Sequence, residues 1–442
     1  MSQKTILHIG FDDTDSPKGM CTTFLAYKIV NLLQRENTEF LDFPRLIRFN
    51  PNIPWKTRGN GAVAIKIKTK NTSKIKNQII NLVSKYSDIK NGANPGLVFF
   101  ENDSIPSTFV NFSNLALWQL INRNNAKRFA KKNNLEIFYQ GNGQGLIGAI
   151  GAIGYYFEDH TFELLSYRKR SKFGKERKIS IESVKTMQEK TFPYTFNSFD
   201  TKKGRILITP HGPDPVFYGV RGENVDSLVH ATKILKSNEK LDGYMIFKSN
   251  QGTSDHLKNT LNFKTMKPFA SGKITGVVCT FPKTVKGGHV FFKILSEDHE
   301  FWCAVYKPTG FSTVASNLIK GDKICIGGGV RKASKNFPRV INLEFIQIIN
   351  LEKNFLTYNP LCKKCNKKMK SKGKNQGFQC IRCGKKFTKK TTVEVSRKIQ
   401  KQLYLPKISA HRHLTRPLQR FGVTNKNIKF DKSLSWFCVY RT

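Results

Sequence analysis

The chain has 442 residues, enough for three or four domains, and it carries 75 Lys and Arg against 31 Asp and Glu. The resulting net charge of +44 at pH 7 favours a polyanion as the main partner. No apolar run approaches the about 18 residues of a membrane span, and the first residues lack the apolar core of a signal peptide. We therefore expect a cytoplasmic protein with no membrane partner, whose nine cysteines are reduced or bound to metal.

The first predicted strand, residues 6–11, runs into a cluster of carboxylates and then into a helix. The carboxylates are Asp12, Asp13 and Asp15, and a turn over residues 16–19 separates them from apolar residues with helical spacing. The sequence therefore predicts a strand, an acidic loop and a helix start in direct succession.

This arrangement suits phosphate chemistry. Carboxylates this close together repel one another unless a cation lies between them, and Mg²⁺ is usually held by carboxylates beside phosphate oxygens. Thr22 or Thr23 occupies the expected N-cap position, and the N–H groups of a helix start bind phosphate oxygens. The alternative is a solvated acidic loop in which Thr22 is only a cap. We favour the functional loop, because this chain has few acidic residues elsewhere.

The first unit follows the order β-α-β-β-α-β, which is typical of a ferredoxin-like sandwich of two helices on an antiparallel sheet. Arg58 lies in an R-G-N-G segment between the second and third strands, where it either approaches the phosphates or belongs to a plain hairpin turn. After the first helix, the predicted elements are strands at 41–49 and 61–68, a helix at 72–86 and a strand at 97–100.

A second unit is predicted to repeat that order, which would complete an α+β core. Gly143, Gly145 and Gly148 match a G-x-G-x-x-G pattern, but the elements that follow do not alternate as a dinucleotide-binding fold requires. The glycines therefore either let the backbone approach a nucleotide phosphate or allow close helix–sheet packing. The predicted elements are strands at 135–139, 160–167, 205–209 continuing through 216–220, and 244–247, a small-residue helix after the glycines and a helix at 224–235.

The next region, residues 271–351, changes to five short β segments broken by Gly, Pro and charged turns. Five strands of this length suit an OB-fold barrel that binds oligonucleotides, with an SH3-like barrel as the rival interpretation.

Cysteine spacing gives the clearest metal signal. Cys362 and Cys365 form one C-x-x-C pair, and Cys380 and Cys383 form another fourteen residues later. Four thiolates in two such pairs close a tetrahedron around one Zn²⁺. We therefore expect a structural zinc ribbon, with paired disulfides as the minor alternative.

The C-terminal part is strongly basic, with 23 Lys or Arg against two acidic residues from position 361 on. Phosphate contacts are the natural use for this charge. Residues 403–422 are too regular in His and Arg for a disordered tail. His411 and His413 lie two residues apart, which suits RNA or interdomain contact better than a metal.

Several motifs together resemble the archaeal isoleucine-tRNA 2-agmatinylcytidine synthetase family along the whole chain. They are G-F-D-D-T-D-S-P-K-G-M-C-T-T, K-T-R-G-N-G-A-V, G-Q-G-L-I-G-A-I-G-A, F-E-L-L-S-Y-R, P-V-F-Y-G-V-R-G-E, the four-cysteine ribbon and I-S-A-H-R-H-L-T-R-P-L. The resemblance implies an ATP-dependent, tRNA-modifying ligase that joins agmatine to carbon 2 of the wobble cytidine of the isoleucine tRNA with a CAU anticodon. It also implies a kinase-like domain, a ferredoxin-like domain, an OB fold and a zinc ribbon.

By this resemblance, Asp12, Asp13 and Asp15 act in catalysis, with Mg²⁺ held by Asp12 and Asp13, and Thr22 is the family's self-phosphorylated threonine. We expect ATP phosphates to be bound by Ser16, Lys18, Gly19, Thr23, Arg58, Gly143 and Gly145. The expected domain limits are 1–125 (kinase-like), 126–268 (ferredoxin-like), 270–352 (OB fold), 358–392 (zinc ribbon) and 393–442 (basic tail).

Agmatine is a dication, so its pocket should contain carboxylates, but the sequence does not select among them. The candidates by chemistry alone are Asp200, Asp214, Glu223, Asp226 and Asp255. Two other functions stay open: a non-catalytic OB-fold and zinc-ribbon RNA-binding protein with a degenerate front half, and a phosphotransferase that acts on a small molecule.

Overall fold

The computed structural model describes residues 4–36, 38–335, 337–426 and 428–440. The chain divides into two compact units, and the first contains Met1–Lys273, Gly327–Glu344 and Leu405–Thr442. The second unit contains Ile274–Ile326 and Phe345–Tyr404. Among the helices in the described ranges, none is both long and apolar enough to cross a membrane.

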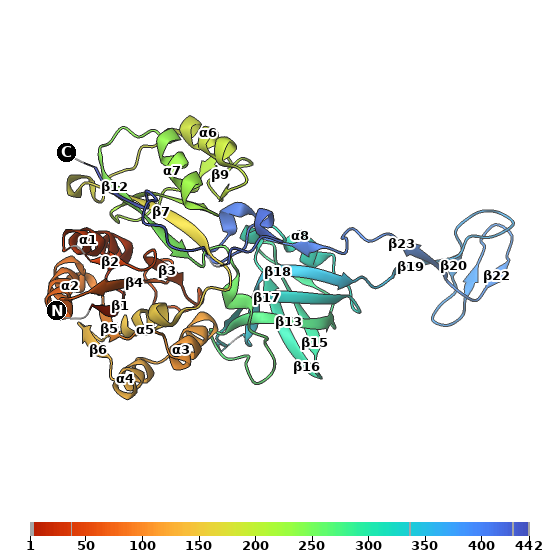
Figure 1. The fold of residues 1–442 in the computed structure, drawn as a ribbon. Helices are drawn as coiled ribbons and strands as arrows, with labels where there is room; N and C mark the ends of the chain where they lie inside the picture. Colours follow the sequence, from red (N-terminus) through yellow and green to blue (C-terminus); the bar gives the residue numbers. More distant parts are fainter. Residues whose placement is uncertain (1–3, 37, 336, 427, 441–442) are drawn as a thin grey trace. The chain divides into compact units, whose positions relative to one another are not determined.

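One half of the large sheet in the first unit has the predicted β-α-β-β-α-β order (Figure 1). Its strands lie in the order β5-β1-β4-β3, and β1 pairs antiparallel with both β4 and β5. This is the strand order 4-1-3-2, so the ferredoxin-like prediction for this half is confirmed. The elements are β1 (Thr5–Asp12), α1 (Thr22–Arg35), β3 (Arg45–Arg48), β4 (Gly61–Thr69), α2 (Thr72–Tyr86) and β5 (Gly96–Glu101), with the short β2 (Glu39–Phe40) beside β4.

The other half of the sheet repeats the 4-1-3-2 order as β12-β7-β11-β8. A short parallel pairing of β3 with β12, in which Lys248 lies opposite Arg45, joins the two halves into one sheet. The elements are β7 (Thr161–Arg168), α6 (Ile181–Thr191), β8 (Thr195–Phe196), β11 (Val216–Gly222), α7 (Val225–Ile234) and β12 (Leu241–Ser249), with β9 (Phe199–Asp200) and β10 (Arg205–Ile206) forming a separate pair.

The predicted start of the second repeat is wrong. Strand β6 (Glu136–Tyr139) pairs with β5 and therefore extends the first half of the sheet. The glycine-rich helix α5 (Leu146–Gly154) shares a core cluster with α3 (Ser107–Trp118) and α4 (Arg123–Lys132). The first helix of the second repeat is instead α6, where Ser180 caps the N-terminus and Val184 and Met187 are buried. The sequence reasoning missed this helix.

Alternation along the strands divides the core between the two faces of the sheet. In β1, Leu7, Ile9 and Phe11 belong to a core cluster with apolar side chains of α1, α2, α6 and α7. On the other face, Ala64 and Val98 pack with α3, α4 and α5. Both faces of the sheet are thus covered by helices, which leaves function to the ends of its strands.

Five β strands form a closed barrel in the order β13-β17-β18-β16-β15, with an additional pairing of β13 with β15, so the OB-fold prediction is supported. They are β13 (Ser271–Val278), β15 (His289–Ser296), β16 (His299–Val305), β17 (Lys323–Arg331) and β18 (Val340–Asn350).

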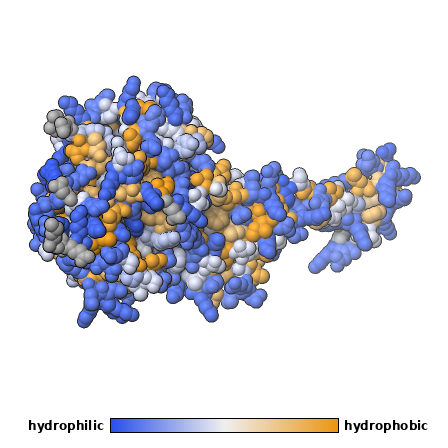
Figure 2. Space-filling view, in the orientation of Figure 1, coloured by the Kyte–Doolittle hydropathy of each residue, from blue (hydrophilic) through white to orange (hydrophobic). Residues whose placement is uncertain are grey.

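The four cysteines hold together a small three-stranded sheet of β20 (Lys370–Ser371), β21 (Phe378–Gln379) and β22 (Lys386–Phe387). Cys362 and Cys380 are buried with Met369 and Phe378 in a cluster of only a few side chains. The visible face of this ribbon is mostly hydrophilic (Figure 2). A core this small depends on its cysteines for stability.

The C-terminal segment, residues 405–440, packs into the first unit. Strand β25 (Phe437–Val439) pairs with β12, and Trp436 belongs to the main core cluster. Arg420 is fully buried, and its guanidinium contacts Asp159 at 3.0 Å and Glu223 at 2.6 Å. For Arg420 the expected phosphate contact is therefore wrong, because two carboxylates of the same unit already neutralise its charge.

Candidate active site

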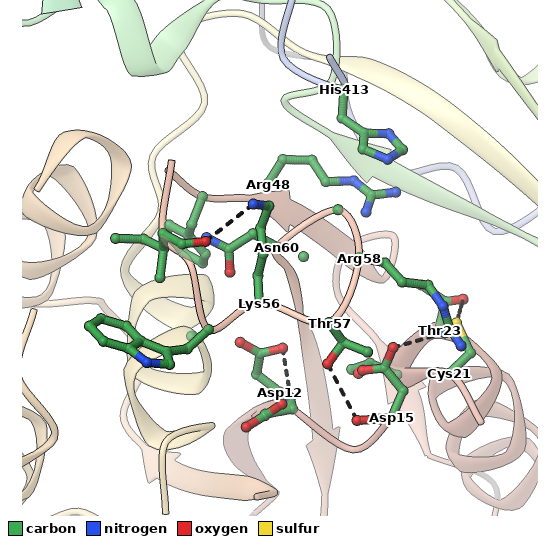
Figure 3. Close-up of a pocket in the computed structure, with 18 of the residues that line it drawn as sticks. Asp12, Asp15, Cys21, Thr23, Arg48, Lys56, Thr57, Arg58, Asn60 and His413 are labelled. Atoms are coloured by element: carbon green, nitrogen blue, oxygen red, sulfur yellow. Dashed lines mark hydrogen bonds and ion pairs between the residues drawn. The ribbon is translucent and has the colours of Figure 1, made fainter. Parts of the chain in front are cut away.

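The carboxyl end of β1 opens into a pocket of about 840 Å³ in the first unit, which we call the acidic pocket (Figure 3). Asp12, Asp13, Asp15, Thr22 and Thr23 all line it. The predicted acidic loop and helix start therefore face one cavity, as the functional interpretation requires and the solvated-loop alternative does not.

The three carboxylates are short of neutralising charge. Burial raises the pKa of Asp12 well above its usual range, and the neighbouring carboxylate of Asp13 raises it further. Burial and the charge of Asp15 raise the pKa of Asp13 to about 7, and burial raises that of Asp15 to about 6. Such a cluster favours protons or an added cation over three free negative charges.

Two of these carboxylates fit a bound Mg²⁺. The Oδ1 atom of Asp12 accepts the backbone N–H of Asp13 at 2.7 Å, which orients its carboxylate. The buried Oδ2 of Asp13 has no hydrogen-bond partner among the described residues. Two carboxylates do not complete six-fold coordination, but Mg²⁺ normally takes its remaining ligands from phosphate oxygens and water. The donor set therefore fits a metal that arrives together with a nucleotide.

Arg58 reaches into the same loop from the segment before β4. Its Nη1 donates to Asp15 Oδ2 at 2.8 Å and to the Met20 carbonyl at 2.9 Å, and its Nη2 donates to the Ser16 carbonyl at 3.1 Å. Its Nε also lies 3.9 Å from Asp214. The R-G-N-G segment thus places a guanidinium in the wall of the acidic pocket, which is compatible with the first of its two interpretations, and a contact with phosphates stays a prediction.

The start of α1 differs from the prediction. The helix begins at Thr22, and the N-cap is Cys21, which makes no side-chain capping hydrogen bond, so neither threonine is the cap. The Thr22 hydroxyl is buried and accepts a hydrogen bond from the Thr14 hydroxyl at 3.1 Å. Thr23 Oγ1 lies 3.1 Å from the sulfur of Cys21. The two hydroxyls are thus free of a capping role.

Five of the seven predicted phosphate-binding residues lie outside the lining of the acidic pocket, and three of them belong to the turn after the carboxylates. Ser16 Oγ donates to Asp88 Oδ2 at 2.5 Å, and Ser16 and Gly19 pair through their backbones. Lys18 is exposed at the tip of this turn. The turn therefore shapes the loop without facing the cavity.

The glycine-rich segment supports helix packing rather than direct phosphate contact. Gly143 and Gly145 do not line the acidic pocket, and a Cβ on Gly145 would overlap the backbones of Asp12 and Gly96. A Cβ on Gly148 would overlap the Asp12 carboxylate. Of the two interpretations of these glycines, the structure favours close packing, which brings α5 directly against the acidic loop.

Several pocket residues were not found from the sequence. Arg48 donates to Glu163 Oε2 at 2.9 Å, and Arg221 lies 3.7 Å from Glu163 Oε1. His413 of the C-terminal segment also lines the pocket, and burial together with Arg48 lowers its pKa well below the usual value. Glu163, Arg221 and His413 lie in motifs that carry the family resemblance, but nothing in the sequence showed that these residues meet Arg48, because the charged triplet comes from three separate strands.

Of the five candidate agmatine carboxylates, Asp214 alone lines the acidic pocket. Glu223 pairs with Arg420, and Asp255 contacts Tyr155 and Lys258. The other two serve locally: Asp200 accepts the backbone N–H of Lys203 at 3.2 Å, and Asp226 is exposed in the first turn of α7.

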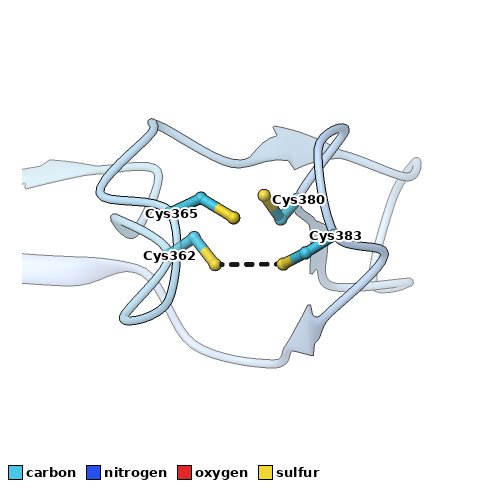
Figure 4. A group of neighbouring side chains, drawn as sticks. All are labelled: Cys362, Cys365, Cys380 and Cys383. Carbon is cyan, nitrogen blue, oxygen red and sulfur yellow. Dashed lines mark hydrogen bonds between the residues drawn. The ribbon is translucent and has the colours of Figure 1, made fainter.

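The four-cysteine site has the geometry of a metal centre (Figure 4). The sulfur atoms of Cys362, Cys365, Cys380 and Cys383 all lie within 4.8 Å of one another. All four cysteines are free thiols, which argues against the disulfide alternative. Within the described ranges this is the only group of three or more His, Cys, Asp or Glu side chains so close together.

Models of three domains of one family match this chain. They are the TiaS TCKD domain at residues 8–74, the TiaS FLD domain at 143–256 and the TiaS C-terminal zinc ribbon domain at 359–399.

Relatives match over nearly the full length. The isoleucine-tRNA 2-agmatinylcytidine synthetase TiaS of Cenarchaeum symbiosum is 46% identical over 99% of this chain and 97% of its own length. That of Thermococcus sibiricus is 40% identical over 93% of this chain and 95% of its own length.

Solved structures agree. A crystal structure of TiaS with its isoleucine tRNA and ATP superposes with a TM-score of 0.87 at 34% identity, covering 96% of this chain and 100% of that one. A complex of TiaS with the same tRNA, AMPCPP and agmatine gives 0.84 at 33% identity with the same coverage. With these similarities and a pocket built on the motifs that first suggested the family, this chain belongs to the TiaS family of isoleucine-tRNA 2-agmatinylcytidine synthetases.

Proposed function

We propose that this chain uses ATP to join agmatine to carbon 2 of the wobble cytidine of the isoleucine tRNA with a CAU anticodon, and that the reaction takes place in the acidic pocket. The proposal rests mainly on the observation that three desolvated carboxylates and the Thr22 hydroxyl face the same cavity. Family membership supplies the substrates. A tRNA-modifying activity supports a cytoplasmic location, and the domain limits expected from the sequence remain part of the proposal.

The chemistry needs an activated base, because the oxygen on carbon 2 of cytosine is a poor leaving group. Phosphoryl transfer from ATP to that oxygen forms a phosphate ester, breaks the P–O bond to the rest of the nucleotide and releases that remainder as the leaving group. The agmatine amine then attacks carbon 2, forms the new C–N bond, loses a proton and releases the oxygen as inorganic phosphate. Little covalent chemistry falls to the protein, so positioning and charge supply most of the rate.

Within this scheme Asp12 and Asp13 would hold Mg²⁺. The metal would neutralise charge on the transferring phosphoryl group. Arg58 reaches the same loop from the other side through its bond to Asp15, and a guanidinium there favours the transition-state charge. The backbone N–H groups at the start of α1 and the Thr23 hydroxyl offer further donors to phosphate oxygens.

Thr22 is our candidate for the self-phosphorylated threonine. Its hydroxyl is buried in the pocket wall and bonds only to Thr14 among the described residues. Asp214 is our candidate for binding one cationic end of agmatine. Burial raises the pKa of Asp214 although Arg58 opposes that shift, and its Oδ2 has no hydrogen-bond partner in the described part of the chain.

The test is an incubation of the protein with agmatine, ATP and unmodified isoleucine tRNA, followed by mass analysis of the wobble nucleoside. We expect a mass gain that matches agmatine addition and that disappears in Asp13→Ala. Asp103→Ala, which removes an exposed carboxylate, is the matched control and should retain activity.

Two outcomes would support the rival functions. Binding of tRNA without ATP turnover would favour the non-catalytic RNA-binding protein. ATP turnover that is indifferent to tRNA would favour a phosphotransferase acting on a small molecule.

A further inference from the structure

A second cavity, of about 530 Å³, adjoins the acidic pocket within the first unit. We call it the basic cavity. The two share lining residues that include Arg48, Arg58 and His413, so these side chains lie between them. The cationic side chains that line the basic cavity are Arg48, Lys56, Arg58, Arg205, Arg221 and Arg412. Its lining, all of it in the described part of the chain, contains no Asp or Glu.

The positive charge of this cavity is only partly neutralised. Arg48 and Arg221 share the single carboxylate of Glu163. Arg58 pairs with Asp15 at 2.8 Å, and Arg412 lies 3.2 Å from Glu344. The Lys56 ammonium donates to the Ile53 carbonyl at 3.1 Å, and Arg205 donates to His211 Nε2 at 2.7 Å. Neither Lys56 nor Arg205 pairs with a carboxylate among the residues that the structure describes. Arg205 is exposed and Lys56 is half-buried, so water screens part of their charge, but cations that face one cavity still repel each other and favour an anion between them.

Buried polar atoms without partners point to the same conclusion. Arg48 Nε, Ser409 Oγ and His413 Nδ1 are buried and have no hydrogen-bond partner in the described ranges. All three residues line the basic cavity. Buried polar atoms in native proteins are nearly always satisfied, so a ligand with several acceptor oxygens is the natural complement.

The position of the cavity restricts what that ligand is. Figure 3 shows Arg48 and His413 across the acidic pocket from Asp12 and Asp15. ATP phosphates that bind with a metal at these carboxylates would therefore lie on the opposite side of the pocket from Arg48 and His413. A nucleotide whose base enters an enzyme pocket carries its own backbone phosphates behind it. Guanidinium groups recognise such phosphates by paired hydrogen bonds.

We propose that the basic cavity binds a backbone phosphodiester of the RNA strand beside the nucleotide whose base enters the acidic pocket, with Arg205 and Lys56 as its unpaired cations. This inference rests on the proposed function for the identity of the RNA. The cavity then works as an anchor: it holds the backbone while the base is modified. Small phosphates share the same chemistry, and the experiment separates the two sources.

The first arm measures binding of the full chain to the isoleucine tRNA at several salt concentrations. Arg205→Gln and Lys56→Gln should each weaken binding about tenfold and reduce the salt slope by about one. The KM for ATP should not change in Arg205→Gln, because Arg205 does not line the acidic pocket. Lys203→Gln removes the same charge from an exposed neighbour outside both cavities and should leave affinity and slope unchanged.

The second arm uses an anticodon stem-loop RNA in which single phosphates flanking the wobble nucleotide are replaced by neutral methylphosphonates. One replacement should weaken binding to the unaltered protein about tenfold and should cause no further loss in Arg205→Gln. A higher KM for ATP with unchanged RNA affinity would overturn the proposal in favour of a small-phosphate site. Unchanged RNA affinity in both variants, with unchanged KM, would overturn it outright.

The two proposals fail separately. If Arg205 and the methylphosphonate prove coupled but no agmatine is attached to the base, the proposed function fails and the phosphate site stands. If agmatine is attached normally but no coupling is found, only the phosphate site fails.

Discussion

The acidic loop, residues 12–23, and the C-terminal segment, residues 405–440, line the same pocket but are encoded in opposite ways. The loop has its strand, carboxylates and threonines in one short stretch of sequence. The C-terminal segment supplies His413 to the pocket, while its buried Arg420 has its partners more than 190 residues earlier, at Asp159 and Glu223. The chemistry is thus local, whereas the walls that enclose it are assembled from distant parts of the chain.

The two regions also differ in what their charges do. At Asp12 and Asp13 the loop gathers carboxylates that have no cationic partner among the described residues, which lowers stability in exchange for a binding site. The C-terminal segment contributes Arg420, whose positive charge neutralises the carboxylates of Asp159 and Glu223. Substitutions of the loop carboxylates should therefore remove activity and preserve the fold, whereas substitution of Arg420 in the segment should lower the free energy of unfolding.

The largest effect is expected for Asp12→Asn. The amide oxygen can still accept the N–H of Asp13, so the loop geometry should persist while the charge is lost. We expect kcat for agmatine attachment to fall about 10³-fold, the upper range for removing one electrostatic contributor. Thermal unfolding should occur at the same or a higher temperature, because a buried negative charge has gone. A marked loss of stability would remove the contrast between the two regions.

Arg420→Met tests the other side of the comparison. The change leaves Asp159 and Glu223 buried without their cation, and breaking such a pair costs about 3–5 kcal/mol. Denaturant unfolding should report this loss. Lys407→Met, an exposed change in the same segment, should shift the free energy of unfolding by less than about 0.5 kcal/mol. Equal effects of the two variants would mean that Arg420 is not a structural cation.

The free energy of unfolding, measured as a function of pH without added Mg²⁺ or ATP, tests the role of the loop's negative charges. The pKa of Asp13 is about 7 and that of Asp15 about 6, against about 4 in unfolded chains. Between pH 4 and 7 the folded protein therefore binds more protons than the unfolded one, so these groups make stability fall as pH rises. Asp13→Asn should reduce this decrease in stability with rising pH. Added Mg²⁺ and ATP should also reduce it. A free energy of unfolding that increases from pH 4 to pH 7, and whose increase is lost in Asp13→Asn, would contradict this expectation.

The smallest effect on the first unit is expected from zinc removal. Elemental analysis should find about one zinc per chain, and Cys380→Ser should lose it. The ribbon's few buried side chains cannot fold without the metal, but they belong to the second unit. Unfolding of the first unit should therefore keep its midpoint in Cys380→Ser. A preparation without zinc that keeps a folded ribbon would contradict this expectation.

The sequence was most informative where the determinants are contiguous. The acidic loop, the cysteine pairs and the five barrel strands were all predicted from local pattern, and α2 ends where its apolar spacing predicts. The glycine pattern was misleading because it is typical both of phosphate binding and of close helix packing. A Cβ on Gly145 or Gly148 would overlap Asp12, which favours the packing role here. The β6 strand was assigned to the wrong repeat because strand pairing is not visible in a single strand. The sequence alone does not distinguish Arg420 from the other basic residues, because its carboxylate partners lie far away along the chain.

The pairing of β25 with β12 and the place of His413 in the pocket wall have a consequence for biosynthesis. A nascent chain that has left the ribosome only as far as the zinc ribbon already exposes Asp12, Asp13 and Thr22. It has neither His413, which lines the cavity, nor β25, which pairs with β12. A chain without the C-terminal segment therefore lacks part of the pocket wall and one partner of β12, so its acidic loop should be a less complete site.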